Sequence, residues 1–170
     1  VNNLFDNNQM ESFAIGDLNH DGFVDIYGSY ATIYTNPTGV DDVIWTNATN
    51  ANHFITLSLK GTISNHSAIG ARAVLYSSLG TQIREVRAGE SYGTCNSAQL
   101  HFGMGAVTAI DSVVVSWPAG GSQTILAPAV DQFLTIIENT CVSPPSTISA
   151  NGPLHICAGH WIVRFDNEGP

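Results

Sequence analysis

Short segments in which apolar and polar residues alternate recur along most of this chain. Ile55, Leu57 and Leu59 alternate with polar neighbours, which is the period-two pattern of a half-buried β-strand. Clusters of Gly, Pro, Asn and Ser bound further segments of strand length, at 31–34, 43–45, 71–77, 81–87, 97–102, 111–117 and 132–138. Strands at this spacing, without intervening helices, predict an all-β fold that is a sandwich or a barrel. Of these, an antiparallel β-sandwich is the fold that we expect.

The alternation also predicts which side chains the two sheets bury. Each sheet has one apolar face, and that face can be buried only against the other sheet. The predicted core residues are Ile55, Leu57, Leu59, Val74, Val113, Val115, Trp117, Leu134 and Ile136. The residues predicted to face outward are Ser58, Lys60, Ser112 and Ser116. For Trp117 a solvent-facing position, suited to stacking on a sugar, is the alternative.

Residues 17–25 have the composition of a loop that binds a hard cation. Oxygen-bearing side chains stand at the first, third, fifth and ninth positions of this stretch, and glycine stands at the sixth. Ca²⁺ takes about six to eight oxygen ligands, and a tight loop supplies them when alternate side chains turn inward. The predicted ligands are the side chains of Asp17, Asn19, Asp21 and Asp25 and the backbone carbonyl of Phe23.

Two features distinguish this loop from an EF-hand loop. Its twelfth position is Gly28 where an EF-hand has glutamate, and the flanking segments 13–15 and 23–27 are β-rich. Calcium bound here would therefore staple a β-hairpin and would be structural. The same residues also suit a polar turn without metal, because Asn, Asp and Gly favour turns. Against that alternative, three carboxylates crowded into one loop repel each other unless a cation neutralises them.

The charge of the chain excludes some classes of partner. Five Lys and Arg stand against fourteen Asp and Glu, which gives a net charge of −9. Nucleic-acid binding needs a basic surface, so we expect none, and an anionic membrane surface is disfavoured as well. No apolar run is long enough to span a bilayer. The chain begins at Val1 without methionine, so it is expected to be a piece of a longer protein, and the missing signal peptide does not argue against secretion.

The three cysteines do not form a metal or redox motif, since no C-x-x-C pair occurs. Cys141 and Cys157 flank a Pro- and Ser-rich segment, and we expect a disulfide between them, worth about 3 kcal/mol in the chain-entropy model. Two free buried thiols are the alternative. Cys95 is expected to stay reduced as a small core residue.

No catalytic constellation is expected. The histidines show no H-E-x-x-H grouping, and Gly103 and Gly105 lack the helix and lysine of a phosphate loop. His20 should point to solvent, and His101 should be a core histidine with its hydrogen bonds satisfied. Arginines 72, 84 and 87 are conspicuous in so acidic a chain. We expect an arginine to pair with Glu85 or Glu90 across strands, with recognition of a carboxylate or sulfate as the alternative.

Residues 13–27, which contain the acidic loop, resemble an FG-GAP (VCBS-type) repeat. This is the β-propeller blade unit with a calcium loop that is found in integrin heads and in many bacterial surface proteins. The resemblance implies that Asp17, Asn19, Asp21 and Asp25 fall on that family's calcium ligands. Only one such repeat is visible, so most of any propeller would lie before Val1.

Five ordered motifs between residues 52 and 138 look like the ASPIC/UnbV domain, named from cartilage acidic protein and its bacterial relatives. The motifs are Asn52-His53-Phe54, Ser64-Asn65 with Ala68-Ile69-Gly70-Ala71-Arg72, Arg84-Glu85-Val86 with Ala88-Gly89, Leu100-His101-Phe102-Gly103-Met104-Gly105, and Ser116-Trp117-Pro118-Ala119-Gly120. The family follows FG-GAP repeats in secreted proteins, and its molecular activity is poorly defined. The tail around Cys141 and Cys157 is similar to Ig-like repeats of large bacterial cell-surface proteins.

These resemblances imply three parts. They are a partial FG-GAP-like repeat with the calcium loop at 1–50, an ASPIC/UnbV-like β-sandwich at 51–139, and a linker with the start of an Ig-like module at 140–170. The expected function is a non-enzymatic, calcium-stabilised extracellular or cell-surface module for adhesion or ligand binding, with a glycan or an extracellular protein as ligand. The alternatives are an ancillary domain of a polysaccharide-degrading enzyme whose catalytic part lies elsewhere, and a structural spacer.

Overall fold

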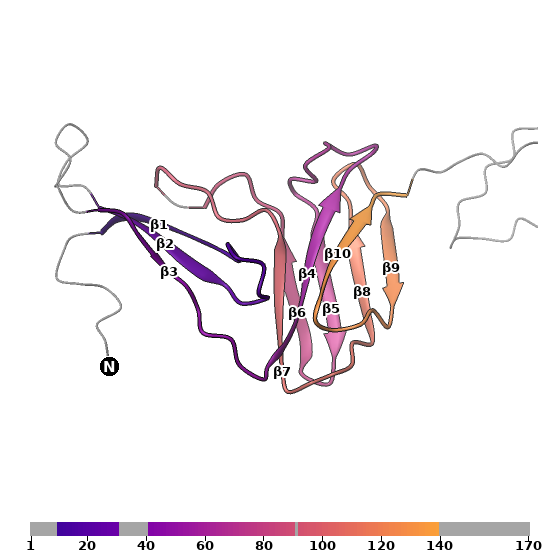
Figure 1. Ribbon diagram of the computed structural model, residues 1–170. Coiled ribbons are helices and arrows are strands. Elements are labelled where there is room, and N and C mark those ends of the chain that lie inside the picture. The colour runs from indigo at the N-terminus through magenta and orange to yellow at the C-terminus, as the bar shows by residue number, and fades with distance from the viewer. Residues whose placement is uncertain (1–9, 31–40, 91, 140–170) are drawn as a thin grey trace, which may run out of the picture. The chain divides into compact units, whose positions relative to one another are not determined.

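The computed structural model of the protein describes residues 10–30, 41–90 and 92–139. The chain divides into two compact units, Val1–Glu138 and Asn139–Pro170. The described residues form ten β-strands and no helix (Figure 1), which confirms the all-β class for this part of the chain. A helix able to cross a membrane is accordingly absent from the described residues. The predicted strand at 31–34 and the predicted disulfide between Cys141 and Cys157 lie outside them.

Each strand predicted within the described ranges is present, with boundaries that differ by a few residues. The strands are β1 (Met10–Gly16), β2 (Asp25–Tyr30), β3 (Val43–Trp45), β4 (His53–Lys60), β5 (Arg72–Ser77), β6 (Gly80–Glu85), β7 (Leu100–Gly105), β8 (Ser112–Ser116), β9 (Ser122–Leu126) and β10 (Gln132–Ile137). The sequence pattern did not predict β9. Its apolar residues, Ile125 and Leu126, stand together and do not alternate.

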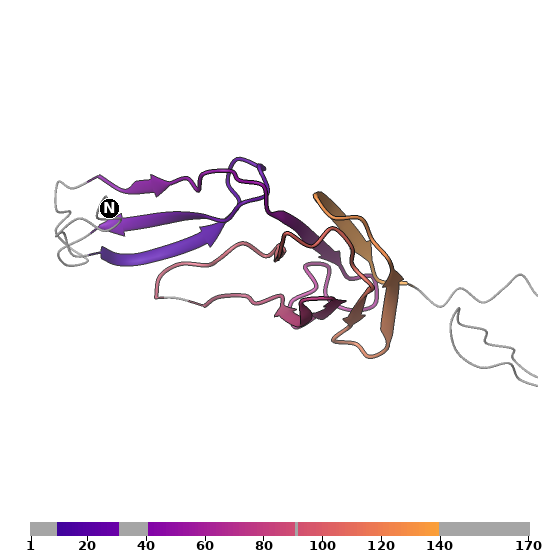
Figure 2. The ribbon, with the colours of Figure 1, turned by 90° about the horizontal axis from the view of Figure 1, so that it is seen from below.

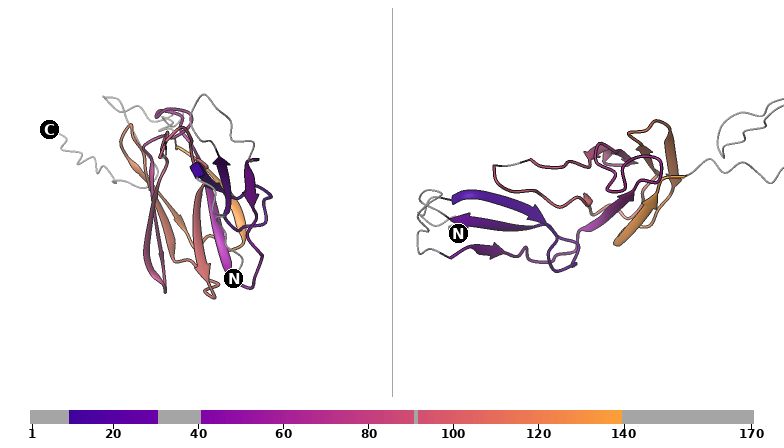
Figure 3. Two further views of the ribbon diagram at one scale, coloured as in Figure 1. Left: turned by 90° about the vertical axis from the view of Figure 1, so that its left-hand side faces the viewer. Right: turned by 90° about the horizontal axis from the view of Figure 1, so that it is seen from above.

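Two sheets pack face to face as a sandwich (Figure 3, left). One sheet has the strand order β6-β5-β8-β9 and is antiparallel throughout. The other has the order β10-β4-β7. A separate three-stranded antiparallel sheet, β1-β2-β3, lies N-terminal to them in the sequence. Whether this sheet is a propeller blade stays a prediction.

The prediction of a purely antiparallel sandwich is wrong at one pair of strands. β10 runs parallel to β4, with Gln132 opposite Ile55 and Ile137 opposite Lys60. Parallel neighbours need a crossover connection of about a dozen residues or more. Here the crossover comprises β5 to β9, and β10 then returns to pair with β4, the strand that precedes the crossover. The alternation of residues within a strand predicts which side chains are buried, but it does not predict whether the strand runs parallel or antiparallel to its neighbours.

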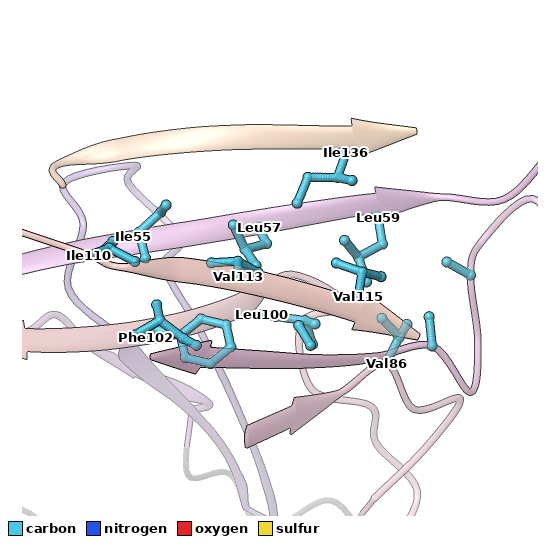
Figure 4. Packing of buried hydrophobic residues seen from close by; sticks show 14 of the residues in the cluster. Ile55, Leu57, Leu59, Val86, Leu100, Phe102, Ile110, Val113, Val115 and Ile136 are labelled. Atoms are coloured by element: carbon cyan, nitrogen blue, oxygen red, sulfur yellow. The ribbon is translucent and has the colours of Figure 1, made fainter. Parts of the chain in front are cut away.

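The core between the two sheets consists mostly of the residues that the alternation predicts. Ile55, Leu57 and Leu59 of β4 point toward Val113 and Val115 of β8 in the opposite sheet (Figure 4). Trp117 and Ile136 are also buried in this core, and Leu134 packs against it half-buried. The core position of Trp117 removes it as a solvent-facing stacking platform. Of the residues predicted to face outward, Lys60 and Ser116 are exposed, whereas Ser58 and Ser112 are half-buried.

Val74 is the one predicted core residue that faces away from the core. Its neighbours Ala73 and Leu75 are fully buried, so β5 has the opposite parity to the one predicted. Val74 lies opposite Val114 and Ile83 on the outer face of the sheet. The sequence Ala73-Val74-Leu75 is apolar at all three positions, so alternation alone could not choose the face.

Two side chains of β6 join the sheets along one side of the sandwich. Gln82 Nε2 donates to the carbonyl of Gly103 at 3.0 Å, and Arg84 Nε donates to the carbonyl of His101 at 3.2 Å. Both acceptors belong to β7, the edge strand of the other sheet. Edge carbonyls that would otherwise be open to a foreign strand are thereby satisfied.

The connection between β6 and β7 extends alongside β1 (Figure 2). Ile15 N donates to Asn96 Oδ1 at 2.9 Å, and Ser97 N donates to the carbonyl of Ile15 at 3.0 Å. This connection therefore covers the free edge of β1 and bonds the three-stranded sheet to the chain of the sandwich.

Candidate functional site

The acidic loop between β1 and β2 turns its side-chain oxygens inward. Asp17 accepts backbone N–H bonds from Asp21 and Gly22, at 3.1 and 2.8 Å. Asn19 Oδ1 accepts a bond from Asp21 N at 3.1 Å, and Asp21 Oδ1 accepts one from Phe23 N at 2.8 Å. Each oxygen keeps a lone pair beyond these bonds, so the loop is held closed without exhausting its acceptors.

Asp25, at the end of the loop, is a buried carboxylate. Its side chain is fully buried at 0% exposure. The two carboxylate oxygens accept N–H bonds from Leu18 and Asn47, at 2.9 and 2.8 Å. No ion pair of the described residues includes Asp25. A buried carboxylate is costly unless a positive charge or several hydrogen bonds compensate it.

The donor set of the loop suits a hard cation in chemistry, since all predicted ligands are oxygens. Among the described residues, however, no three Asp, Glu, His or Cys side chains gather into a ready-made metal site. The carboxylates are held by backbone N–H groups instead. The calcium interpretation and the polar-turn interpretation of this loop therefore both remain, and calcium is taken up below as a proposal.

The loop packs directly on the sandwich through aromatic contacts. Gly22, at φ +88°, lies so close to Phe54 that an added Cβ would come within 2.0 Å of the ring. Phe23 contacts the same ring at 6.4 Å between centroids. His20 meets Phe133 edge-on at 5.2 Å, and Phe133 meets Phe54 at 5.6 Å. His20 is exposed as predicted, yet it contributes a ring to this aromatic cluster.

A cleft with a volume of about 390 Å³ opens beside this loop. Its lining is mixed, and it is named the polar cleft below for the charged groups that it contains. Its walls come from the end of β1 and the start of the loop, from β4, β6 and β7, and from the connection between β6 and β7. The polar side chains that matter for its chemistry are Asp17, Arg84, Glu90, Ser97, Gln99 and His101, and apolar lining comes from Ile15, Val24 and Leu100. The volume lies within the roughly 300–1,000 Å³ of small-molecule sites.

One arginine of the cleft is neutralised within the protein. Arg87 donates to Glu90 at 2.7 Å, and Asn96 Nδ2 donates to the same carboxylate at 2.8 Å. The hydrogen bond from Asn96 holds the pKa of Glu90 below its ordinary value, and Arg87 adds to the effect. The expected pairing of an arginine with Glu90 is thus confirmed, although within one connection and not across strands.

Arg84 is fixed in place but not neutralised. Its Nη1 donates to the carbonyl of Ile83 at 2.8 Å, and its guanidinium lies 5.4 Å from the centre of the Phe102 ring. None of the carboxylates in the described residues forms an ion pair with it. The guanidinium is therefore oriented by backbone and aromatic contacts.

His101 contributes a neutral imidazole to the cleft. Its Nδ1 lies 3.1 Å from Thr56 Oγ1, and its ring stacks on Phe54 at 6.0 Å. Burial lowers the pKa of His101; the charge of Asp17 opposes this effect and that of Arg84 adds to it. The predicted role as a histidine satisfied within the fold agrees with these contacts.

A G-x-S-x-G pattern spans residues 89–93, so the expectation of no catalytic constellation was wrong in assuming that the sequence contains no such pattern. In α/β-hydrolases this pattern forms a strand-to-helix turn that exposes the serine. Here it lies in the connection between β6 and β7, and no helix follows it in the described residues. Ser91 itself is outside them. The pattern thus lacks the structural context of a nucleophile elbow.

Cys95 is exposed, so its expected place in the core is wrong. It belongs to the same connection, and its thiol donates to the carbonyl of Ala88 at 3.3 Å. It has no disulfide partner among the described residues. Asn96 and Gln99, which the sequence pattern did not single out, gain their place in the cleft only from the path of this connection along β1.

The fold and the cleft define an all-β protein with a β-sandwich and an acidic loop packed on it. Residues 61–143 match the family model described as ASPIC and UnbV. The match spans β5 to β10 and supports the ASPIC/UnbV part of the resemblance. The FG-GAP and Ig-like parts stay predictions. No curated protein matches the chain.

Proposed function

We propose that the chain is a non-enzymatic, calcium-stabilised binding module of a larger secreted or cell-surface protein. The observation that carries the proposal is the double position of Asp17. This residue belongs to the predicted cation loop and also lines the polar cleft. Whatever fixes the loop therefore also fixes one wall of a ligand-sized cleft.

Calcium is the stabilising ion of this proposal. Asp17, Asn19, Asp21 and Asp25 would hold it through side-chain oxygens, and Phe23 through its carbonyl. The buried carboxylate of Asp25, which has two N–H donors and no cationic partner in the described residues, supports the presence of a positive charge nearby. Bound calcium would offset two of the three carboxylate charges of the loop and reinforce its packing on Phe54.

In the same proposal, β1-β2-β3 is one blade of the FG-GAP type. Ile15 lines the cleft, and the opposite face of this sheet carries the cross-strand neighbours Tyr27 and Ile44. They are 36% and 56% exposed. A sheet with one partly exposed apolar face is what a blade presents toward an adjacent blade, and this supports the assignment.

The contacts of the cleft support binding over catalysis. Glu90 is engaged by Arg87 and Asn96, so it is not a free general base. The hydroxyl that meets His101 belongs to Thr56, which is only 2% exposed and therefore poorly placed to attack a substrate. We expect no turnover of chromogenic ester or glycoside substrates by the chain. Turnover that disappears in Ser91→Ala would contradict the non-enzymatic assignment and give the G-x-S-x-G pattern a catalytic role.

Thermal unfolding of the chain in 1 mM CaCl₂ and in EDTA tests the calcium site. A ligand that binds only the folded state stabilises it by about 2.7 kcal/mol at a concentration of one hundred times Kd, so the melting temperature should rise by several degrees in calcium. Asp21→Ala should remove this difference. Asp41→Ala, which changes an exposed carboxylate outside the loop, is the matched control and should keep it. Equal melting temperatures of the wild type in calcium and in EDTA would reduce the loop to a polar turn.

A further inference from the structure

We propose that the polar cleft binds the carboxylate of an acidic saccharide, a hexuronate unit, through the guanidinium of Arg84, and that calcium in the neighbouring loop strengthens this binding. The inference rests on the proposed function, because it takes both the binding role of the cleft and the calcium site from it. It adds the chemical class of the ligand, the residue that recognises it and the reason for the calcium dependence.

The first argument is the orientation of Arg84. Two of its five N–H groups are used in bonds to the carbonyls of His101 and Ile83. The ring of Phe102 beneath the guanidinium limits the rotation of the side chain. Three N–H groups remain for a ligand, at a side chain that has already lost much of its rotational freedom. A planar guanidinium held in this way matches the two oxygens of a carboxylate.

The second argument is the balance of charge in the cleft. Arg87 and Glu90 neutralise each other at 2.7 Å. Glu85 also borders the cleft, but it follows Arg84 directly in β6, so its side chain projects to the opposite face of the strand, where Arg72 is its cross-strand neighbour. Arg84 and Asp17 are then the remaining charges. Calcium bound to the loop would offset much of the charge of Asp17, so that Arg84 would be the main charge presented to a ligand in the cleft.

The third argument is that the rest of the cleft suits a saccharide. Neutral polar groups stand next to apolar patches, as the hydroxyl groups and the C–H faces of a sugar ring require. The side-chain amide of Gln99 makes no hydrogen bond among the described residues, and His101 is neutral. Leu100 and Val24 supply apolar lining. Inorganic anions would use Arg84 alone, whereas a uronate uses both the charge and the neutral surface.

The test is calorimetric titration of the full 170-residue chain with two probes. One probe is a tetrasaccharide of alternating glucuronate and N-acetylglucosamine. The other is the same tetrasaccharide with its carboxylates reduced to primary alcohols. In 1 mM CaCl₂ we expect the acidic probe to bind at least tenfold more tightly than the reduced probe. Replacement of calcium by EDTA should lower the affinity for the acidic probe several-fold and leave that for the reduced probe nearly unchanged.

Variants then assign the carboxylate contact to Arg84. Arg84→Gln should lower the affinity for the acidic probe at least tenfold. Arg84→Lys keeps the charge without the planar guanidinium, so its affinity should lie between those of the wild type and Arg84→Gln. Arg72→Gln removes an arginine from the outer face of the same sheet and should bind like the wild type. Circular dichroism of each variant checks folding. The comparison of the two probes on the wild type needs no variant, so it tests recognition of the carboxylate even if Arg84→Gln does not fold.

The outcomes separate this inference from the proposed function. Equal binding of both probes would overturn the uronate inference and leave a saccharide-binding module standing. Tight binding of the acidic probe by Arg84→Gln would show that another group recognises the carboxylate, which also overturns it. If neither probe binds, the inference is overturned. Calcium-dependent melting would still support the proposed loop in that case.

Discussion

Glu138 illustrates how a single buried charge is satisfied without a cationic partner. Its side chain is only 4% exposed, and the three successive backbone N–H groups of Thr62, Ile63 and Ser64 donate to its Oε2 at 2.9, 2.9 and 2.7 Å. Ser64 Oγ donates to Oε1 at 2.9 Å and accepts a bond from Ala119 N. Such a backbone nest is an anion site, and here the protein's own carboxylate fills it, which ties the end of β10 to the loop after β4.

This arrangement predicts a defined pH dependence of stability. Burial raises the pKa of Glu138, but the N–H bonds from Ser64 and Thr62 and the hydroxyl of Ser64 outweigh it, and the net shift is below the ordinary value of 4.5. The unfolded state therefore binds a proton before the folded state does, so the contribution is complete above about pH 4.5 and is lost as the pH falls through the folded pKa.

Glu138→Gln should accordingly lose about 2 kcal/mol of unfolding free energy at pH 7, because hydrogen bonds to a charged group are replaced by bonds to a neutral amide. The difference from the wild type should shrink as the pH is lowered from 5 to 3. Urea unfolding at several pH values measures it, with Glu85→Gln, an exposed strand residue, as the control. A difference that stays constant with pH would mean that the carboxylate is not responsible.

Gly22 and Gly80 form a matched pair that tests the packing of the loop on the sandwich. Both have positive φ, +88° and +96°, so alanine pays a similar backbone cost at either position. Only at Gly22 would the new Cβ collide with the ring of Phe54, whereas nothing lies within 4 Å at Gly80. Gly22→Ala should therefore be less stable than Gly80→Ala by roughly 1–3 kcal/mol in urea unfolding. Equal losses would show that the loop does not rest on Phe54.

Sequence reasoning succeeded for residues whose environment is set by alternation and failed for those set by long-range contacts. Ile55, Val113 and Ile136 are buried as their strands predict. The environment of Glu138 depends on a loop more than seventy positions away, and an acidic residue after a strand otherwise looks like an ordinary surface residue. Cys95 was misplaced for a similar reason, since its exposure follows from the path of the β6–β7 connection.

The strands themselves were predictable because each carries its own apolar pattern and its own bounding turns. Their pairing was not. β10 has the same kind of pattern as β8, yet it joins β4 in parallel, while β8 pairs with β5 antiparallel. That difference arises from the crossover of the chain between the two sheets. β9 was not predicted because its strand conformation depends on pairing with β8, in which Val113 lies opposite Ile125.

The connection between β6 and β7 shows the same limit at the candidate site. The acidic loop could be recognised from its own nine residues, because the spacing of oxygens and glycine is local. The polar cleft could not, since it forms only where this connection lies along β1 and where Arg84 reaches the edge of β7. Sequence analysis noted Arg84 and His101 separately, and the fold brings them to one wall.

The described part of the unit Val1–Glu138 is joined across its sheets by both polar and aromatic contacts. Asn96 and Ser97 bond to Ile15, and the rings around Phe54 connect the acidic loop to β4 and β10. The sandwich nevertheless has a complete core of its own, from Ile55 to Ile136. These two facts have different consequences for a fragment that lacks the N-terminal sheet.

Residues 51–139, expressed alone, should fold cooperatively into a β-structure but melt at a lower temperature than residues 1–139. Phe54 would lose Gly22 and Phe23, and Phe133 would lose His20, and this newly exposed apolar surface should cost about 1–3 kcal/mol. Circular dichroism during heating measures the difference, which should amount to several degrees.

A second variant isolates one of these contacts. Phe133→Ala in residues 1–139 should lower the melting temperature by the part of this difference that comes from the contact of Phe133 with His20. A fragment with a helical spectrum or without a cooperative transition would show that the sandwich depends on the N-terminal sheet to fold. A fragment as stable as residues 1–139 would show that the aromatic contacts contribute little.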